Sequence, residues 1–274
     1  MPVIPVLGTF GLLALAQLSA GEVQAIEGLH GLGNIRHHEI VSKRADHRYD
    51  ILVGLPGEAA ADNDTRYPVV YILDGGSLFP MLRTYQRYLR LGEETPDVIL
   101  VGISYGSDDW KTGNNRSHEF TAPSEEREFW GGAADFLDFM QSELIPYIEA
   151  HYAADAARRI IFGQSLGGQF VLFAAQTRPD IFWGHIASNP ALHRNLSYFL
   201  EKRPDPTDAT PRLFVSSGAE DDPVFRIPAL EWMETWAGRS DLPWDLETVS
   251  LDGHSHFSAP PAAYRAGMRW LFKP

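Results

Sequence analysis

The chain has no cysteine among its 274 residues. Disulfide bonds, thiolate metal ligands and a cysteine nucleophile are therefore excluded, while the compartment stays open. Basic residues are also scarce, since 23 lysines and arginines stand against 36 acidic residues and give a formal net charge of −13. A surface with this charge repels phosphate backbones and anionic membranes, so we do not expect a nucleic-acid partner.

Charge is missing altogether from residues 1–21, and Val3–Leu18 is almost entirely apolar. Together with the small-residue sequence at 23–25, this pattern predicts a secretory signal peptide in residues 1–25, with an N-terminal arm as the alternative. Prolines and glycines interrupt the run, and no other segment is long and apolar enough, so we expect no stable membrane span. We therefore expect a periplasmic or secreted protein, with the cytoplasm as the alternative.

The remaining residues, 26–274, alternate apolar runs with amphipathic stretches. With 44% hydrophobic residues the chain can bury one large core, and we expect a single catalytic domain. Val69–Leu73 and Val98–Ile103 are continuous apolar runs, as in strands that are covered on both faces. Such alternation predicts an α/β fold, with a mostly parallel central sheet and helices on both faces. Ligands of these sheets bind at the carboxyl ends of the strands.

A G-x-S-x-G sequence occurs at Gly163–Gly167, between the apolar run 160–162 and a helix-like run at 170–175. This strand, sharp turn and helix are the context of a nucleophile elbow. We expect glycines two residues on either side of Ser165 because side chains there would clash. Ser165 is the candidate nucleophile, and the alternative is a glycine-rich turn without a catalytic role.

A serine hydroxyl needs a general base, and the base needs an acid that orients it. In α/β-hydrolases the acid follows the serine in the chain. The predicted strand at 213–216 ends before three consecutive acidic residues. Asp221 is the favoured triad acid because it lies three residues after Gly218. Glu220 is the main alternative, and Asp222 is the third.

The histidine should come last in this order. The predicted strand at 246–251 is followed by His254 and His256, and we favour His256 as the base. A metal site at this H-x-H pair is the alternative for both residues. No second cluster of histidines and carboxylates supplies further ligands, so we expect neither a metal nor another cofactor.

An oxyanion hole needs two backbone N–H groups that point at the developing negative charge. The first should come from Leu166, directly after the nucleophile, and the second from Gly76, in the turn after the Val69–Leu73 strand. We expect a helix after that turn, near Phe79–Leu91. The alternative for the turn is an ordinary tight turn.

Six segments resemble, in order, the Putative esterase family of the α/β-hydrolase superfamily, which includes siderophore, feruloyl and acetyl-xylan esterases, S-formylglutathione hydrolases and mycolyltransferases. The likeness spans about residues 35–272, and siderophore-type esterases of bacteria are the most similar subgroup. Its final H-x-S sequence favours His256 over His254. The segments are Tyr67–Gly75, Arg116–Pro123, Glu143–Ile148, Gly163–Gly168, Ser188–Leu192 and His256–Ser258.

This resemblance implies an α/β-hydrolase fold and a serine carboxylic-ester hydrolase that works through a Ser-His-Asp/Glu triad and an acyl-enzyme. The substrate would be a small-molecule or glycan-linked ester, including siderophore and feruloyl esters. An acyltransferase with the same triad is the alternative, and a non-catalytic binding module is disfavoured because both the serine and the histidine are present. In the loop at 104–130, Trp110 and Arg116 could line a substrate pocket, although we favour a structural pair of Arg116 with Glu119. The sequence does not indicate an oligomeric state.

Overall fold

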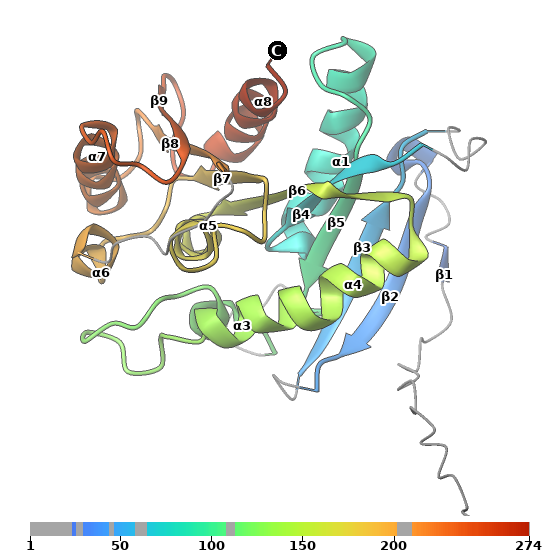
Figure 1. Ribbon diagram of the computed structural model, residues 1–274, viewed down its shortest axis with the longest axis horizontal. Coiled ribbons are helices and arrows are strands. Elements are labelled where there is room, and N and C mark those ends of the chain that lie inside the picture. The colour runs from blue at the N-terminus through green and yellow to red at the C-terminus, as the bar shows by residue number, and fades with distance from the viewer. Residues whose placement is uncertain are drawn as a thin grey trace, which may run out of the picture.

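The computed structural model describes residues 24–25, 30–43, 47–57, 65–107, 113–201 and 210–273. The strands within them form one sheet in the order β1-β2-β3-β5-β4-β6-β7-β8-β9 (Figure 1). Of the segment predicted as a signal peptide or arm, all but Gln24 and Ala25 lies outside the described residues. The strands are β1 (Gln24–Ala25), β2 (Ile35–Val41), β3 (Arg48–Gly54), β4 (Tyr67–Ile72), β5 (Ile99–Ser104), β6 (Ala154–Gln164), β7 (Gly184–Ser188), β8 (Arg212–Gly218) and β9 (Asp245–Leu251).

Strand direction divides the sheet into two parts. β1, β2 and β3 are antiparallel to their neighbours, and β3 pairs antiparallel with β5. From β5 across to β9 all pairs are parallel. This arrangement confirms the predicted mostly parallel sheet of an α/β-hydrolase. The register of Gln164 with Ser188, and of Ser188 with Ser216, brings the carboxyl ends of β6, β7 and β8 to the same edge.

Helices cover both faces of the sheet. In β4 the side chains of Val69 and Tyr71 join one buried cluster, and those of Val70 and Ile72 join the other, because successive strand residues point to opposite faces. α3, α4, α5 and α7 pack on the first face, and α1 and α8 on the second. The helices are α1 (Gly75–Leu91), α2 (Arg116–Glu119), α3 (Ala133–Phe139), α4 (Ile145–His151), α5 (Leu166–Thr177), α6 (Leu196–Glu201), α7 (Pro223–Ala237) and α8 (Ala259–Leu271), with the short helix η1 at His30–Leu32.

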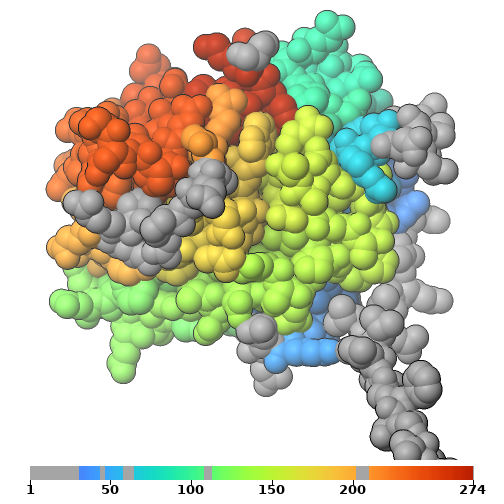
Figure 2. Space-filling view, in the orientation of Figure 1, coloured from blue at the N-terminus to red at the C-terminus, as the bar shows by residue number. Residues whose placement is uncertain are grey.

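α3 and α4 are joined by one π-helical turn, η2 (Met140–Leu144). This wider turn ends two residues before Pro146, which cannot donate the backbone hydrogen bond of a regular α-helix. Figure 2 shows the outer surface of this layer, with α3 and α4 in green and α7 in orange. Within the residues that the structure describes, no helix has both the length and the apolar character to cross a bilayer.

Candidate active site

Ser165 lies in the turn between β6 and α5, with φ 59° and ψ −117°. A residue with a side chain rarely adopts positive φ, so the surrounding backbone has to hold this conformation. The N–H of Ser165 donates to the carbonyl of Ser188 at 3.0 Å, and its own carbonyl accepts from Ala191 at 3.0 Å. These two hydrogen bonds, to the last residue of β7 and to the loop that follows it, hold the turn in the shape of the predicted elbow.

Glycines around this turn are needed at two positions. A Cβ on Gly163 would lie 2.2 Å from the carbonyl oxygen of Gly167, and one on Gly168 would lie 2.8 Å from that of Ser188. Gly167 itself has ordinary space for a Cβ, with Leu73 as its nearest neighbour at 3.4 Å. The expected clash is thus confirmed before the serine, but after it the requirement falls on Gly168 rather than Gly167.

The structure brings His256 and Asp221 together. Nδ1 of His256 donates to Oδ2 of Asp221 at 2.8 Å, and their side chains are only 9% and 1% exposed. Because Nδ1 carries the proton in this hydrogen bond, Nε2 remains available to accept one. Glu220 is exposed and makes a backbone contact with His254, through its N–H. The geometry therefore favours Asp221 among the three acidic residues.

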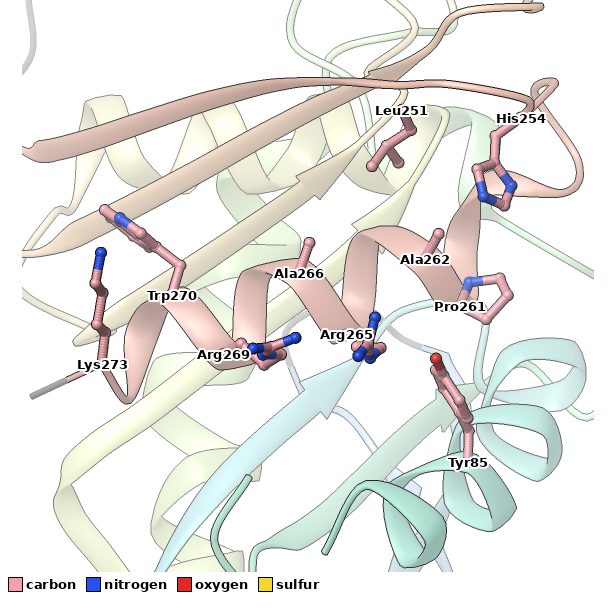
Figure 3. A pocket seen from close by; sticks show the side chains of 10 residues that line it. All are labelled: Tyr85, Leu251, His254, Pro261, Ala262, Arg265, Ala266, Arg269, Trp270 and Lys273. Atoms are coloured by element: carbon pink, nitrogen blue, oxygen red, sulfur yellow. The ribbon is translucent and has the colours of Figure 1, made fainter. Parts of the chain in front are cut away.

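Asp222 and His254 make different contacts. Oδ1 of Asp222 accepts from the N–H of Val224 at 2.9 Å and caps the first turn of α7. Nδ1 of His254 donates to the carbonyl of Ser258 at 3.1 Å, and the ring faces a surface groove along α8, beside Pro261 (Figure 3). Among the described residues, no group of three or more histidine, aspartate and glutamate side chains could hold a metal ion.

Asn189 is a further residue at this site, and the sequence analysis missed it. Its Nδ2 donates to Oδ2 of Asp221 at 2.7 Å, and its backbone N–H donates to the carbonyl of Ser216 at 2.8 Å. Asn189 has φ 43°, a conformation that asparagine adopts more readily than most residues. An asparagine directly after the strand next to the elbow was the available signal. With the N–H of Asp222 on Oδ1 at 2.7 Å, the Asp221 carboxylate accepts three hydrogen bonds.

The imidazole of His256 is also held by packing. Phe225, in the first turn of α7, stacks on it with ring centroids 4.4 Å apart and an interplanar angle of 29°. Nε2 of Gln164, the residue before the elbow serine, donates to the His256 carbonyl at 2.7 Å. The ring of His256 is therefore held by α7, and its backbone by the residue before the elbow serine. Phe257, the residue after His256, is 90% exposed at the same edge of the sheet.

The turn between β4 and α1 carries the predicted oxyanion glycine. A Cβ on Gly75 would lie 2.5 Å from the backbone nitrogen of Ile103, so only glycine fits against β5. α1 begins at Gly75, four residues before the predicted start near Phe79, because the left-handed Asp74 turns the chain directly into the helix. Gly76 and Leu166 both lie in the first turn of a helix, where backbone N–H groups have no partner within the helix.

Arg116 pairs with Asp74. Its Nε lies 2.7 Å from Oδ1 and its Nη2 lies 2.9 Å from Oδ2 of Asp74. The favoured pair with Glu119 is therefore wrong. Glu119 is instead buried and accepts from the hydroxyl of Tyr105 at 2.8 Å, and burial raises the pKa of its carboxyl group. Arg116 therefore contacts the turn after β4, whereas Glu119 contacts the core through Tyr105.

Ser165 and His256 line one cleft of about 380 Å³ at the carboxyl edge of the sheet. Gly76 and Arg116 line it too, so it contains four of the residues that the sequence analysis singled out. Trp110, the other predicted pocket residue, lies outside the described residues. The remaining lining residues are Asp74, Ser77, Leu78, Ser104, Tyr105, Ser107, Asn114, Gln164, Phe257 and Pro260.

Known proteins resemble this chain over most of its length. The model of the family described as "Putative esterase" matches residues 42–270. Ferri-bacillibactin esterase BesA of Bacillus subtilis is 29% identical over 259 residues, which cover 86% of this chain and 89% of that protein. Apo-salmochelin esterase of Escherichia coli is 26% identical over 164 residues, which cover 56% of this chain and 50% of that protein.

A solved structure supports the same relationship. The crystal structure of the BES protein from Bacillus cereus superimposes with a TM-score of 0.78 at 25% identity. The match covers 92% of this chain and 98% of that one. The likeness in fold therefore extends over most of both chains.

Proposed function

The chain belongs to the Putative esterase family and is an ester hydrolase, and from this premise we propose that it is a serine carboxylesterase. Ser165 is the nucleophile, His256 the general base and Asp221 the acid that orients the base. The observation that carries this proposal is the hydrogen bond of 2.8 Å between His256 and the buried Asp221, at the wall of the cleft that Ser165 lines. Glu220 is not needed in this triad.

The proposed reaction has two halves. Nε2 of His256 accepts the proton of the Ser165 hydroxyl as its oxygen attacks the ester carbonyl. The N–H groups of Gly76 and Leu166 stabilise the oxyanion, and the alcohol leaves with the proton that His256 returns. Water then attacks the acyl-enzyme with the same histidine as base, which releases the acid and restores Ser165.

Within the ester hydrolases we propose a siderophore-type ester as the substrate. The support is that the two similar proteins described above are named as siderophore esterases, one of them over 86% of this chain. The hydroxyl and amide groups of Ser77, Ser104 and Asn114 offer hydrogen bonds to a polar ester.

We also propose that the protein is exported and that residues 1–25 are removed. N-terminal sequencing of the protein recovered from the periplasm and from the medium tests this proposal.

The experiment compares the wild type with Ser165→Ala in hydrolysis of p-nitrophenyl acetate and butyrate, and maps a fluorophosphonate label by mass spectrometry. We expect the substitution to abolish both hydrolysis and labelling. Ser142→Ala is the matched control, because Ser142 is exposed on η2. Activity that survives Ser165→Ala, or a label on another residue, would overturn the proposal.

A further inference from the structure

We infer that Phe225 is a positioning residue for the general base, and that its ring stabilises His256 more strongly once the imidazole has taken the proton of Ser165. The inference rests on the proposed function and adds a side chain to the same site. It follows from the geometry and burial of one aromatic stack, and from the charge that His256 carries during the proposed reaction.

The first turn of α7 places Phe225 over the imidazole. α7 begins at Pro223, directly after the Asp222 cap, and packs beside β8 and β9 (Figure 1). The ring centroids of Phe225 and His256 are 4.4 Å apart, and the interplanar angle is 29°. The imidazole therefore lies against the π face of Phe225 and not against its edge. Such a contact restricts rotation of the imidazole about its hydrogen bond to Asp221.

This contact gains strength when the imidazole becomes charged. The face of an aromatic ring is the negative part of its quadrupole, so it attracts a cation that lies within about 6 Å of the ring centroid. In the proposed reaction His256 is neutral before the attack and becomes an imidazolium as the tetrahedral intermediate forms. Its side chain is only 9% exposed, so water screens the attraction little. An interaction that is stronger in the transition state than in the ground state raises kcat.

A second histidine packs on the same phenylalanine without competing for this role. The ring centroids of His193 and Phe225 are 5.0 Å apart at an interplanar angle of 90°, an edge-to-face contact. Burial lowers the pKa of His193, so its ring is neutral near neutral pH and does not repel an imidazolium. The carboxylate of Asp221 is bound at Nδ1 of His256. The imidazolium is then held between a carboxylate at one nitrogen and a phenyl ring on its face.

Packing alone does not account for this arrangement. Phe225 is only half-buried, whereas Trp232 and Trp236, which fill the core from the same helix, are almost fully buried. Phe225 is also not one of the residues that line the cleft, so it is not placed to bind the substrate. A change in its ring should therefore act on kcat and not on KM.

The first test changes the charge distribution of the ring and keeps its shape. Replacement of Phe225 by its monofluoro, difluoro and trifluoro analogues withdraws electron density from the π face step by step. We expect kcat for p-nitrophenyl butyrate to fall with each fluorine, about fivefold for the trifluoro analogue, and KM to stay within about twofold. An equal kcat across the series would overturn the inference, because a packing role depends on shape and not on the quadrupole.

The second test removes the π face and keeps an apolar side chain, in Phe225→Leu. We expect kcat to fall about tenfold, because the imidazole loses both its flat support and the attraction for its charged form. On the acid side, the pH of half-maximal kcat/KM should move lower by about half a unit, since the imidazolium releases its proton more readily. Ile227→Ala is the matched control, because it removes an exposed apolar side chain from the same end of α7, and it should leave both values unchanged. A half-maximal pH that stays in place or moves higher in Phe225→Leu would contradict the inference.

A titration without turnover separates this inference from the proposed function. The imidazole C–H signals of His256, followed by NMR as the pH is varied, give the midpoint of its protonation directly. We expect this midpoint to be lower in Phe225→Leu than in the wild type by the same half unit of about. An unchanged midpoint would overturn the role of Phe225 and leave the esterase standing, whereas hydrolysis that survives Ser165→Ala would overturn the proposed function itself.

Discussion

Two aspartates at the carboxyl edge of the sheet have different partners. Asp221, between β8 and α7, accepts from an imidazole, an amide and a backbone N–H, whereas Asp74, between β4 and α1, accepts twice from a guanidinium. A guanidinium keeps its charge at every pH that the protein meets, but an imidazole gains and loses a proton near neutrality. An aspartate carboxylate can therefore support proton transfer, as we propose for Asp221, or fix a loop, as Asp74 does. The partner of the carboxylate determines which of the two roles it has.

The largest effect should come from Asp221→Asn. A carboxamide can donate to Nδ1 of His256, which would leave the proton on Nε2 and prevent it from accepting the one on Ser165. We expect kcat/KM for p-nitrophenyl butyrate to fall about 10,000-fold, as for the triad aspartate of serine proteases. Glu220→Gln is the matched control, because Glu220 is exposed, and should stay within about twofold of the wild type. A comparable loss in the control would show that the acid has been assigned to the wrong residue.

Breaking the other pair should act on stability more than on chemistry. Arg116→Ala leaves the mostly buried carboxylate of Asp74 without its partner, and we expect a loss of about 3 kcal/mol in the free energy of unfolding. Because Asp74 directly precedes the glycines at the start of α1, kcat should also fall, by about tenfold. Urea denaturation and steady-state kinetics measure the two effects.

Two variants separate charge from geometry at this pair. Arg116→Lys keeps the charge but cannot bind Asp74 in the bidentate manner, so it should fall between the wild type and Arg116→Ala. Adding Asp74→Asn to Arg116→Ala removes the uncompensated carboxylate and should restore part of the stability. An Arg116→Ala protein as stable as the wild type would contradict the view of this pair as a fixed support.

Substitution of Asn189, which donates to Asp221, should have a smaller effect. Asn189→Ala removes one hydrogen bond to a carboxylate, which is worth about 2 kcal/mol. We expect kcat/KM to fall about tenfold, because Asp221 is then held by one hydrogen bond fewer and orients His256 less well. Asn189→Gly is the matched variant, because glycine relieves the positive φ of this position without restoring the amide. It should recover stability but not kcat/KM, and full activity in Asn189→Gly would remove Asn189 from the site.

The sequence predicted those parts of the site that depend on local pattern. Ser165 follows an apolar run that forms the central strand β6, His256 follows the last strand, β9, and the order of serine, acid and histidine placed them at one edge. Asp221 could be favoured but not separated from its neighbours, because the direction of each side chain depends on how the chain turns after Gly218. A Cβ on Gly218 would lie 2.3 Å from the carbonyl oxygen of His254, so the contact with the loop after β9 determines how the chain turns after Gly218.

Contacts between distant segments could not be predicted in this way. Asn189 is 32 residues from Asp221, and Arg116 is 42 residues from Asp74. Each pair depends on which strands are neighbours in the sheet, and a single sequence does not show that. The predicted partner of Arg116 was wrong for the same reason. Glu119, three residues away, is near in the sequence, whereas Asp74 in the turn after β4 is near only in the folded structure.

The smallest effect should come from Asp222→Ala, next to the triad acid. The Asp222 side chain caps α7 through the N–H of Val224, and losing such a cap costs about 1 kcal/mol in the free energy of unfolding. Its contact with Asp221 is made by the backbone N–H, which alanine retains, so kcat/KM should stay within about twofold. Asp222→Asn preserves a capping oxygen and should recover most of the stability. Thermal unfolding and kinetics on the three proteins would separate the cap from catalysis, and a large fall in kcat/KM in both variants would mean that the exposed carboxylate, not the buried one, serves His256.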